Sequence, residues 1–216
     1  DLVAEYVDAV RAEGLKVGLY FSLLDWFHDD FPHYGDRNHP MRNNPAYKND
    51  DRDFDRYLTY MHNQVREICT NYGKLDVLWF DFSYDTLRGE AWKATELINM
   101  VRKLQPDVII DNRLEVSGEG YGSLAAGNPT PYHGDFVSPE QMIPPNGIQD
   151  VNGNDIAWES CVTMNNHWGY CANDHFFKPA PMLIKKLVRI EGWKPAFERW
   201  PGRQGKYPGG VDRTAG

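Results

Sequence analysis

The segment Val77-Leu78-Trp79-Phe80-Asp81-Phe82 places four apolar or aromatic residues directly before a carboxylate. It follows Asn71-Tyr72-Gly73 and precedes the polar residues Ser83-Tyr84-Asp85. A short apolar segment between such boundaries predicts a parallel β-strand that is covered on both faces. Asp81 then stands at the carboxyl end of the strand, where (β/α)8 barrels carry their chemistry. The same position suits a turn or a helix N-cap equally well, because Asp is common after strands.

Helical and strand-like segments alternate on both sides of this strand. Three segments have apolar residues at helical spacing and end near a Gly or a Pro: residues 2–13, 53–70 and 90–104. Three short β-prone segments follow them in turn: residues 15–22, 77–82 and 108–113. This alternation predicts the α/β class, with parallel strands joined by crossover helices. Further along, we expect an irregular, functional excursion over residues 116–156, a strand at residues 158–163 and a helix at residues 181–188.

The composition narrows the classes of partner. Acidic residues outnumber basic ones by 31 to 23, and the net charge of −8 disfavours a nucleic-acid or anionic-membrane partner. No apolar segment reaches the length of about 18 residues that a membrane span needs. The three cysteines, Cys69, Cys161 and Cys171, have spacings that suit neither a disulfide framework nor a zinc site, so we expect free, buried thiols. The cellular compartment stays undecided.

Polar side chains follow the predicted strands at the points where they end. They are Tyr20 and Ser22 after the first strand, Asp81 after the second, and Asp111, Asn112 and Arg113 after the third. Parallel strands bring these ends to one rim, and the later segment 135–140 adds a second carboxylate, Glu140. Two carboxylates near one rim, with aromatic residues and an Arg, are the minimum that glycoside hydrolysis requires.

A metal site is the competing chemistry, because His28, Asp29, Asp30, His33 and His39 lie close together in the sequence. Their spacing matches no metal-binding signature, and such a loop is more often a hydrogen-bonded surface. The chain also lacks a Gly-rich phosphate loop and a Gly-x-Ser-x-Gly elbow. We therefore predict neither a metal nor an organic cofactor.

Six motifs, in this order, resemble glycoside hydrolase family 29, the α-L-fucosidases. They are Gly14-Leu15-Lys16-Val17-Gly18-Leu19-Tyr20-Phe21-Ser22-Leu23-Leu24-Asp25-Trp26, Leu78-Trp79-Phe80-Asp81, Asn112-Arg113-Leu114, Gly134-Asp135-Phe136-Val137-Ser138-Pro139-Glu140-Gln141, Trp158-Glu159-Ser160-Cys161 and Trp168-Gly169-Tyr170. The resemblance covers residues 1 to about 188. It implies a retaining hydrolase that acts on fucosylated oligosaccharides or glycoconjugates at the rim of a (β/α)8, TIM-like barrel.

The resemblance also implies roles for individual residues. Asp81 matches the nucleophile, and Glu140 matches the acid/base of many members, which a retaining mechanism places about 5–5.5 Å apart. Glu159 is the alternative acid/base, because it lies in the recognisable Trp-Glu motif, while its other interpretation is a structural carboxylate. Glu140 is preferred because it lies on a loop that can overhang a substrate. The remaining matches are to fucose-contacting positions: Tyr20, Trp79, Arg113 and Trp168.

The chain departs from the family at both ends. It opens directly on a helical pattern at Asp1, without the upstream His-Trp-Gly and Lys-His-His-Asp-Gly-Phe segments, so we expect a partial barrel that lacks its first strands. After Val188 the family's Gly-Gly-Asn-Leu-Leu-Leu-Asn-x-Gly-Pro strand is missing. Residues 192–201 read one base later can encode Gly-Gly-Asn-Leu-Leu-Leu-Asn-Val-Gly-Pro, which indicates a frameshift near residues 188–190.

These departures divide the expected chain into two parts. Residues 1–188 form the partial catalytic barrel, and residues 189–216 form an irregular, out-of-frame tail. A barrel without its first and last strands leaves parallel edges and a core face uncovered, which favours aggregation. The alternative function is therefore an inactive fragment, or a remnant that binds sugar without cleaving it.

Overall fold

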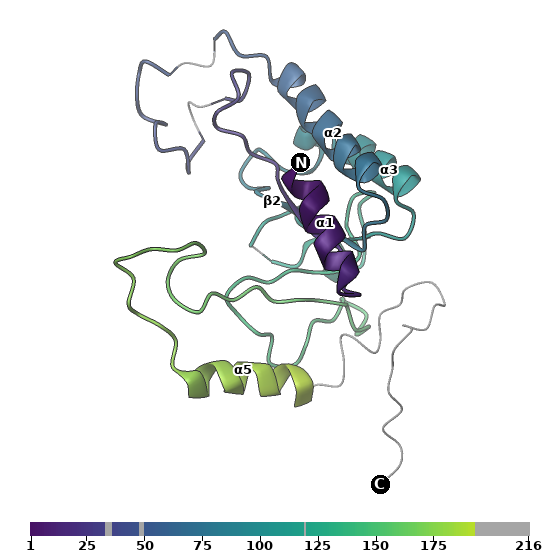
Figure 1. Cartoon of the computed structure of the whole chain (residues 1–216), viewed down its shortest axis with the longest axis vertical. Coiled ribbons are helices and arrows are strands. Elements are labelled where there is room, and N and C mark those ends of the chain that lie inside the picture. Colours follow the sequence, from purple (N-terminus) through teal and green to yellow (C-terminus); the bar gives the residue numbers. More distant parts are fainter. Residues whose placement is uncertain (33–35, 48–49, 119, 193–216) are drawn as a thin grey trace.

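The computed structural model describes residues 1–32, 36–47, 50–118 and 120–192 (Figure 1). The secondary structure alternates between helices and short strands, as the sequence predicts. Its elements are helix α1 (Leu2–Ala12), strand β1 (Gly18–Ser22), helix α2 (Phe54–Asn71), strand β2 (Val77–Asp81), the 3-10 helix η1 (Gly89–Trp92), helix α3 (Ala94–Leu104), strand β3 (Ile109–Ile110), helix α4 (Gly122–Ala125) and helix α5 (Ala180–Gly192).

The three strands form one parallel sheet in the order β1-β2-β3. Ser22 pairs with Asp81, and Leu78 pairs with Ile110, so the carboxyl ends of successive strands meet at one edge. An isolated parallel bridge from Asp111 to Phe136 continues the pairing beyond β3, and two more, Val137 to Trp158 and Glu140 to Cys161, join the later segments to each other. The α/β class with parallel strands is thereby confirmed, while the partial (β/α)8 barrel stays a prediction.

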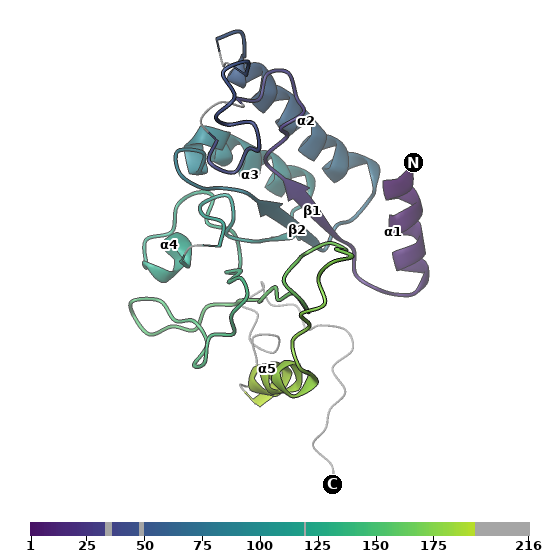
Figure 2. The same ribbon diagram turned by 90° about the vertical axis from the view of Figure 1, so that its left-hand side faces the viewer.

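The side chains of β2 alternate between two environments. Leu78 and Phe80 are fully buried in the apolar core, which they share with residues of α2 and α3. The two helices lie side by side in both views (Figures 1 and 2). Trp79 and Asp81 are only partly buried, because alternate residues of a strand point to opposite faces of the sheet. The helix-covered face therefore anchors the strand, and the other face is left for the site.

Two expected elements differ from the structure. The helix expected over residues 90–104 is interrupted at Lys93, which has φ = 50°, so that η1 precedes α3. The interruption seats Trp92 in the core, where its indole Nε1 donates to Leu87 O at 3.0 Å. The strand expected at residues 158–163 is reduced to bridges at Trp158 and Cys161, because only single residues pair with the neighbouring segment.

The C-terminal helix extends beyond its expected end. Helix α5 spans Ala180–Gly192 and lies at the opposite end of the described chain from α2 (Figures 1 and 2). The division expected at residue 188 stays a prediction, since residues 193–216 of the expected tail lie outside the described residues. All three cysteines are free thiols, as predicted, but only Cys69 is buried. In the part of the chain that the structure describes, no helix is both long and apolar enough to cross a membrane.

Gly134 offers a test of how the segment that carries Glu140 is fixed to the sheet. Its φ is +74°, and an added Cβ would lie 2.1 Å from Asp111 O. Gly14 has a similar φ of +69° with no atom within 4 Å of an added Cβ. We expect Gly14→Ala to lower the free energy of unfolding by about 1–2 kcal/mol, the cost of a left-handed conformation. Gly134→Ala should cost clearly more, because residues 134–140 must move away from β3.

Denaturant unfolding of the two variants and the native chain measures this difference. Equal destabilisation of the two variants would contradict the close approach of Gly134 to the end of β3.

Candidate active site

A cavity of about 690 Å³ opens at the carboxyl ends of the parallel strands. All six residues predicted for the site line it, and so does the alternative acid/base. Tyr20 comes from β1, Trp79 and Asp81 from β2, Arg113 from the segment after β3, Glu140 and Glu159 from the bridged segments, and Trp168 from the loop beyond them. Chain segments that are far apart in the sequence therefore converge as the strand order predicts.

Arg113 joins the two carboxylates that are predicted to be catalytic. Its Nη1 donates to Asp81 Oδ1 at 2.9 Å and to Glu140 Oε2 at 3.1 Å. The two oxygens accept hydrogen bonds from the same nitrogen, so their separation cannot exceed the sum of the two distances, 6.0 Å. This limit is compatible with the separation of about 5–5.5 Å in retaining glycosidases, where one carboxylate attacks the sugar directly. Arg113 is only 2% exposed, so both contacts lie largely out of water.

Further donors fix the orientation of the Asp81 carboxylate. Tyr20 Oη donates to Asp81 Oδ2 at 2.9 Å, and Phe82 N donates to Oδ1 at 2.8 Å. Burial and the neighbouring Asp81 charge raise the pKa of Tyr20, so its hydroxyl keeps the proton that it donates. Phe82 has φ = 75°, a left-handed conformation that is uncommon for a bulky residue. The chain therefore bends sharply directly after the nucleophile candidate.

Trp79 connects the aromatic and the acidic parts of the cavity. Its ring stacks on Tyr20 with centroids 5.5 Å apart, and the Arg113 guanidinium carbon lies 4.4 Å from the Trp79 ring. Trp79 Nε1 donates to Glu159 Oε1 at 2.6 Å. Burial raises the pKa of Glu159, as suits a general acid. Glu159 thus meets one requirement of an acid/base, whereas Glu140 shares the Arg113 nitrogen with Asp81.

Asp111 and Asn112, which the sequence also placed at the rim, are buried and do not line the cavity. Asn112 Oδ1 accepts from Ser138 N at 3.1 Å and so holds the segment that carries Glu140. Asp111 is fully buried, and its Oδ1 accepts from Phe80 N at 3.0 Å. Its Oδ2 has no hydrogen-bond partner among the described residues. Burial raises the pKa of Asp111 well above its usual range, which favours the neutral acid.

Six further residues line the cavity that the sequence did not predict for the site: Arg37, Asn38, Phe82, Tyr84, Ser117 and Cys161. Phe82 and Tyr84 had a signal, because they follow Asp81 directly, and Cys161 ends a motif that resembles the family. The other three lie in irregular loops, where no periodicity marks a side chain that reaches the site, and needed the tertiary structure.

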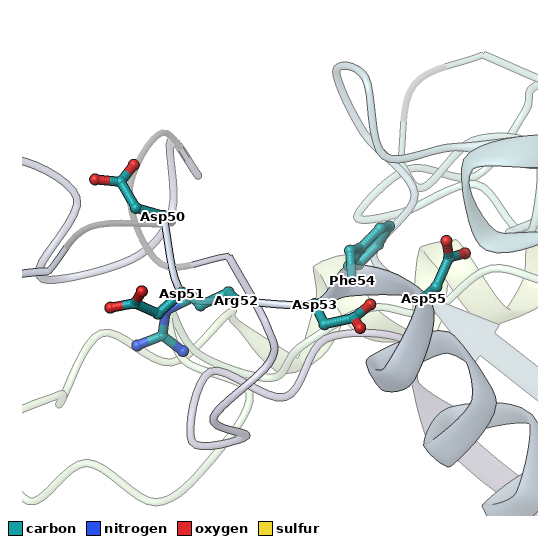
Figure 3. A pocket seen from close by; sticks show the side chains of 6 residues that line it. All are labelled: Asp50, Asp51, Arg52, Asp53, Phe54 and Asp55. Carbon is teal, nitrogen blue, oxygen red and sulfur yellow. The ribbon is translucent and has the colours of Figure 1, made fainter.

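The alternative metal-binding cluster is engaged in other contacts. His28 Nδ1 accepts from Asp30 N at 3.1 Å, and His39 Nδ1 accepts from Met41 N at 2.9 Å, while His33 lies outside the described residues. A second acidic stretch, residues 50–55, lines a shallow pocket before α2, and its carboxylates lie apart rather than around one point (Figure 3). Within the described ranges, no three His, Cys, Asp or Glu side chains are grouped to hold a metal ion.

Comparison with known proteins identifies the family of the chain. The chain matches the α-L-fucosidase family over residues 1–192. It is similar to the solved structure of α-L-fucosidase isoenzyme 1 from Paenibacillus thiaminolyticus, with 55% sequence identity and a TM-score of 0.81 over 88% of this chain and 44% of that one. It is also similar to α-L-fucosidase AlfC from Lactobacillus casei in complex with its α-L-fucose product, with 26% identity and a TM-score of 0.63 over 89% of this chain and 55% of that one.

The curated relatives are less similar in sequence than the Paenibacillus enzyme. The α-L-fucosidase of Dictyostelium discoideum is 25% identical over 99% of this chain and 42% of its own length. The tissue α-L-fucosidase of Homo sapiens is 23% identical over 79% of this chain and 31% of its own length. The chain therefore belongs to the α-L-fucosidase family. It spans less than half the length of these curated relatives.

The buried acid Asp111 makes stability depend on pH. The folded chain keeps the Asp111 proton where an unfolded Asp, with a pKa near 3.9, has lost it. Unfolding then releases a proton, so the free energy of unfolding falls as the pH rises above about 4, by up to about 1.4 kcal/mol per pH unit. In Asp111→Asn there is no such proton, and the amide oxygen can still accept from Phe80 N. We expect this variant to be more stable than the native chain at pH 7, with the gain shrinking toward pH 4.

Denaturant unfolding at several pH values measures the gain, and Asp8→Asn, on the exposed surface of α1, is the matched control. A gain of the same size at pH 4 and pH 7 would contradict a buried, protonated Asp111.

Proposed function

We propose that the protein hydrolyses α-L-fucosides with retention of anomeric configuration, using Asp81 as the nucleophile and Glu140 as the acid/base. The observation that carries the proposal is the Arg113 nitrogen that bonds to one oxygen of each carboxylate. The substrate class, fucosylated oligosaccharides or glycoconjugates, follows from membership of the family. Solved relatives include α-L-fucosidase AlfC with bound α-L-fucose product.

The first chemical step uses the two carboxylates in different protonation states. A retaining mechanism needs one carboxyl group that gives a proton and one carboxylate that attacks. Glu140 gives a proton to the leaving oxygen as the bond from that oxygen to the anomeric carbon breaks, while Asp81 attacks the anomeric carbon and forms a glycosyl ester. The Tyr20 hydroxyl and Phe82 N hold the Asp81 oxygens in place, so little orientation is lost on reaching the transition state.

The second step uses the contact between Arg113 and Glu140. Once Asp81 is esterified, its negative charge is gone, and the guanidinium is left with Glu140 as its remaining carboxylate partner. Glu140 gave its proton to the leaving group in the first step, so it now accepts a proton from water as the water attacks the ester, which releases fucose and restores the Asp81 carboxylate. One buried cation thus holds the group that acts as the acid in the first step and as the base in the second.

The aromatic side chains supply the contact surface for the sugar ring. Tyr20 and Trp79 form a stacked pair, and Trp168 lines the same cavity with 62% of its surface exposed. Aromatic faces contribute apolar area, and an Nε1–H or hydroxyl group can bind a polar partner at the edge. A deoxy-sugar presents both C–H groups and hydroxyls, so this combination suits it.

Release of 4-nitrophenol from 4-nitrophenyl α-L-fucoside tests the activity directly. We expect measurable release by the native chain, and the loss of nearly all of it in Asp81→Gly because the ester can no longer form. Azide should restore turnover of Asp81→Gly and give the fucosyl azide of inverted configuration, since azide then takes the place of the nucleophile. Binding of L-fucose without any nitrophenol release would instead support a sugar-binding remnant.

The acid/base is assigned by a matched pair of variants, Glu140→Gly and Glu159→Gly. We expect Glu140→Gly to lose about 10²–10⁴-fold in turnover, with azide restoring it and giving the fucosyl azide of retained configuration. Azide needs no general base when it attacks the ester, which is why it replaces the missing group. Rescue of Glu159→Gly together with an active Glu140→Gly would move the acid/base role to Glu159.

A further inference from the structure

Ser83 lies two residues beyond the proposed nucleophile and is fully buried. Its hydroxyl donates to Leu114 O at 3.2 Å and accepts from Trp92 Nε1 at 3.1 Å. Leu114 directly follows Arg113 in the chain. The hydroxyl of Ser83 therefore joins the segment after Asp81 to the segment that carries the guanidinium.

The backbone of Ser83 makes a second connection between the same two segments. Ser83 N donates to Ser117 Oγ at 2.9 Å, and Ser83 O accepts from Ser117 N at 2.9 Å. Three of these four hydrogen bonds thus reach the segment after β3, and the fourth comes from Trp92 in the core. Buried polar groups whose partners are all in place hold one arrangement. The turn after β2 is therefore fixed against the segment after β3.

Phe82, between Asp81 and Ser83, carries the backbone strain of this turn. Its φ of 75° lies in the left-handed region, which is uncommon for a bulky side chain. A conformation of this kind persists only where the surrounding structure holds it, and the bonds of Ser83 supply that restraint. The conformation directs Phe82 N toward Asp81 Oδ1, 2.8 Å away.

The two donors to Asp81 Oδ1 both depend on this restraint. One is Phe82 N, and the other is Arg113 Nη1, at 2.9 Å. Phe82 is the chain neighbour of Ser83, and Arg113 is the chain neighbour of Leu114, to which the Ser83 hydroxyl donates. The bond from Ser83 to Leu114 thus sets where the two donors lie relative to each other. The orientation of the Asp81 carboxylate follows from their positions.

We propose that Ser83 is a positioning residue for the nucleophilic attack, acting on the Asp81 carboxylate through Phe82 N and Arg113. Ser83 does not line the cavity, so it acts on the reaction only through these neighbours. The inference rests on the proposed function, because a nucleophile needs positioning only where a fucosyl bond is cleaved. Attack requires the reacting atoms to be aligned, and a small displacement of one of them is costly.

Hydrolysis of 4-nitrophenyl α-L-fucoside by Ser83→Ala is the first test. We expect kcat/KM to fall about 10–10²-fold, because the displaced carboxylate is poorly aligned for attack. The affinity for L-fucose, measured by calorimetry, should stay unchanged, since Ser83 does not reach the sugar. Ser83→Cys, which keeps a weak donor in the same place, should lie between Ser83→Ala and the native chain. An unchanged kcat/KM in Ser83→Ala overturns the proposal.

The Asp81→Gly background separates positioning of the nucleophile from a general loss of structure. There azide forms the new bond to the anomeric carbon, and the bond to the nitrophenolate oxygen breaks with its electron pair. Because no Asp81 carboxylate is left to position, adding Ser83→Ala should leave the azide-dependent rate unchanged. If it instead lowers that rate as much as it lowers the rate of the native chain, Ser83 only supports the fold, and the proposal fails.

Cys69→Ala is the matched control, because Cys69 is buried on α2 and does not line the cavity. Like Ser83→Ala, it removes one buried atom of a side chain. Thermal unfolding compares the stability that the two variants lose. Per folded protein, kcat/KM of Cys69→Ala should equal that of the native chain. Equal falls of kcat/KM in the two variants would count against a specific role of Ser83.

A cationic ligand distinguishes failure of the positioning role from failure of the proposed function. If the native chain releases no nitrophenol, the proposed hydrolysis fails, and the probe is a protonated iminosugar of L-fuco configuration, whose ammonium group pairs with the Asp81 carboxylate. Weaker binding of the iminosugar by Ser83→Ala, with unchanged affinity for neutral L-fucose, supports the positioning of Asp81 on its own. Equal affinity of the native chain and Ser83→Ala for the iminosugar overturns it.

Discussion

The arrangement of the site depends on one buried cation, the guanidinium of Arg113. It is almost fully removed from water and bonds through a single nitrogen to Asp81 and Glu140, while its second terminal nitrogen donates to Ser138 O at 3.1 Å. A buried charge is stable only when it is paired and hydrogen-bonded, so the carboxylates must lie where they do for Arg113 to be buried. The same pairing brings together the two acids that we propose as nucleophile and acid/base.

The sheet supplies the rigid frame for this pairing. β2 packs Leu78 and Phe80 against the helix-covered core and presents Trp79 and Asp81 on the other face, so core packing fixes the position of the nucleophile candidate. The segment that carries Glu140 is tied to the end of β3 through the bridge from Asp111 to Phe136 and the bond from Ser138 N to Asn112. Functional groups on loops are thus held by contacts with regular strands.

Two buried acids other than Asp81 and Glu140 show different ways to hold a carboxyl group. Asp36 is surrounded by donors and holds Tyr84 against residues 36–38 beside the cavity, whereas Asp111 has one donor, and burial raises its pKa well above its usual range. Among the described acids, Arg113 forms ion pairs with Asp81 and Glu140 and not with Asp111.

The sequence by itself determined the α/β class and the parallel strands, because apolar periodicity is a local signal. The six residues predicted for the site rested on short motifs and their resemblance to a family; the structure brings these residues to one cavity, and their roles stay proposals. The sequence did not predict the break at Lys93 or the loss of a regular strand at residues 158–163, which follow from how Trp92 and the bridged segments pack. Only the tertiary structure decided that Asp111 is buried, that Arg113 bonds to both carboxylates and that Arg37 lines the cavity. These features depend on contacts between segments far apart in the chain, and residue type and spacing do not give the distance between such segments.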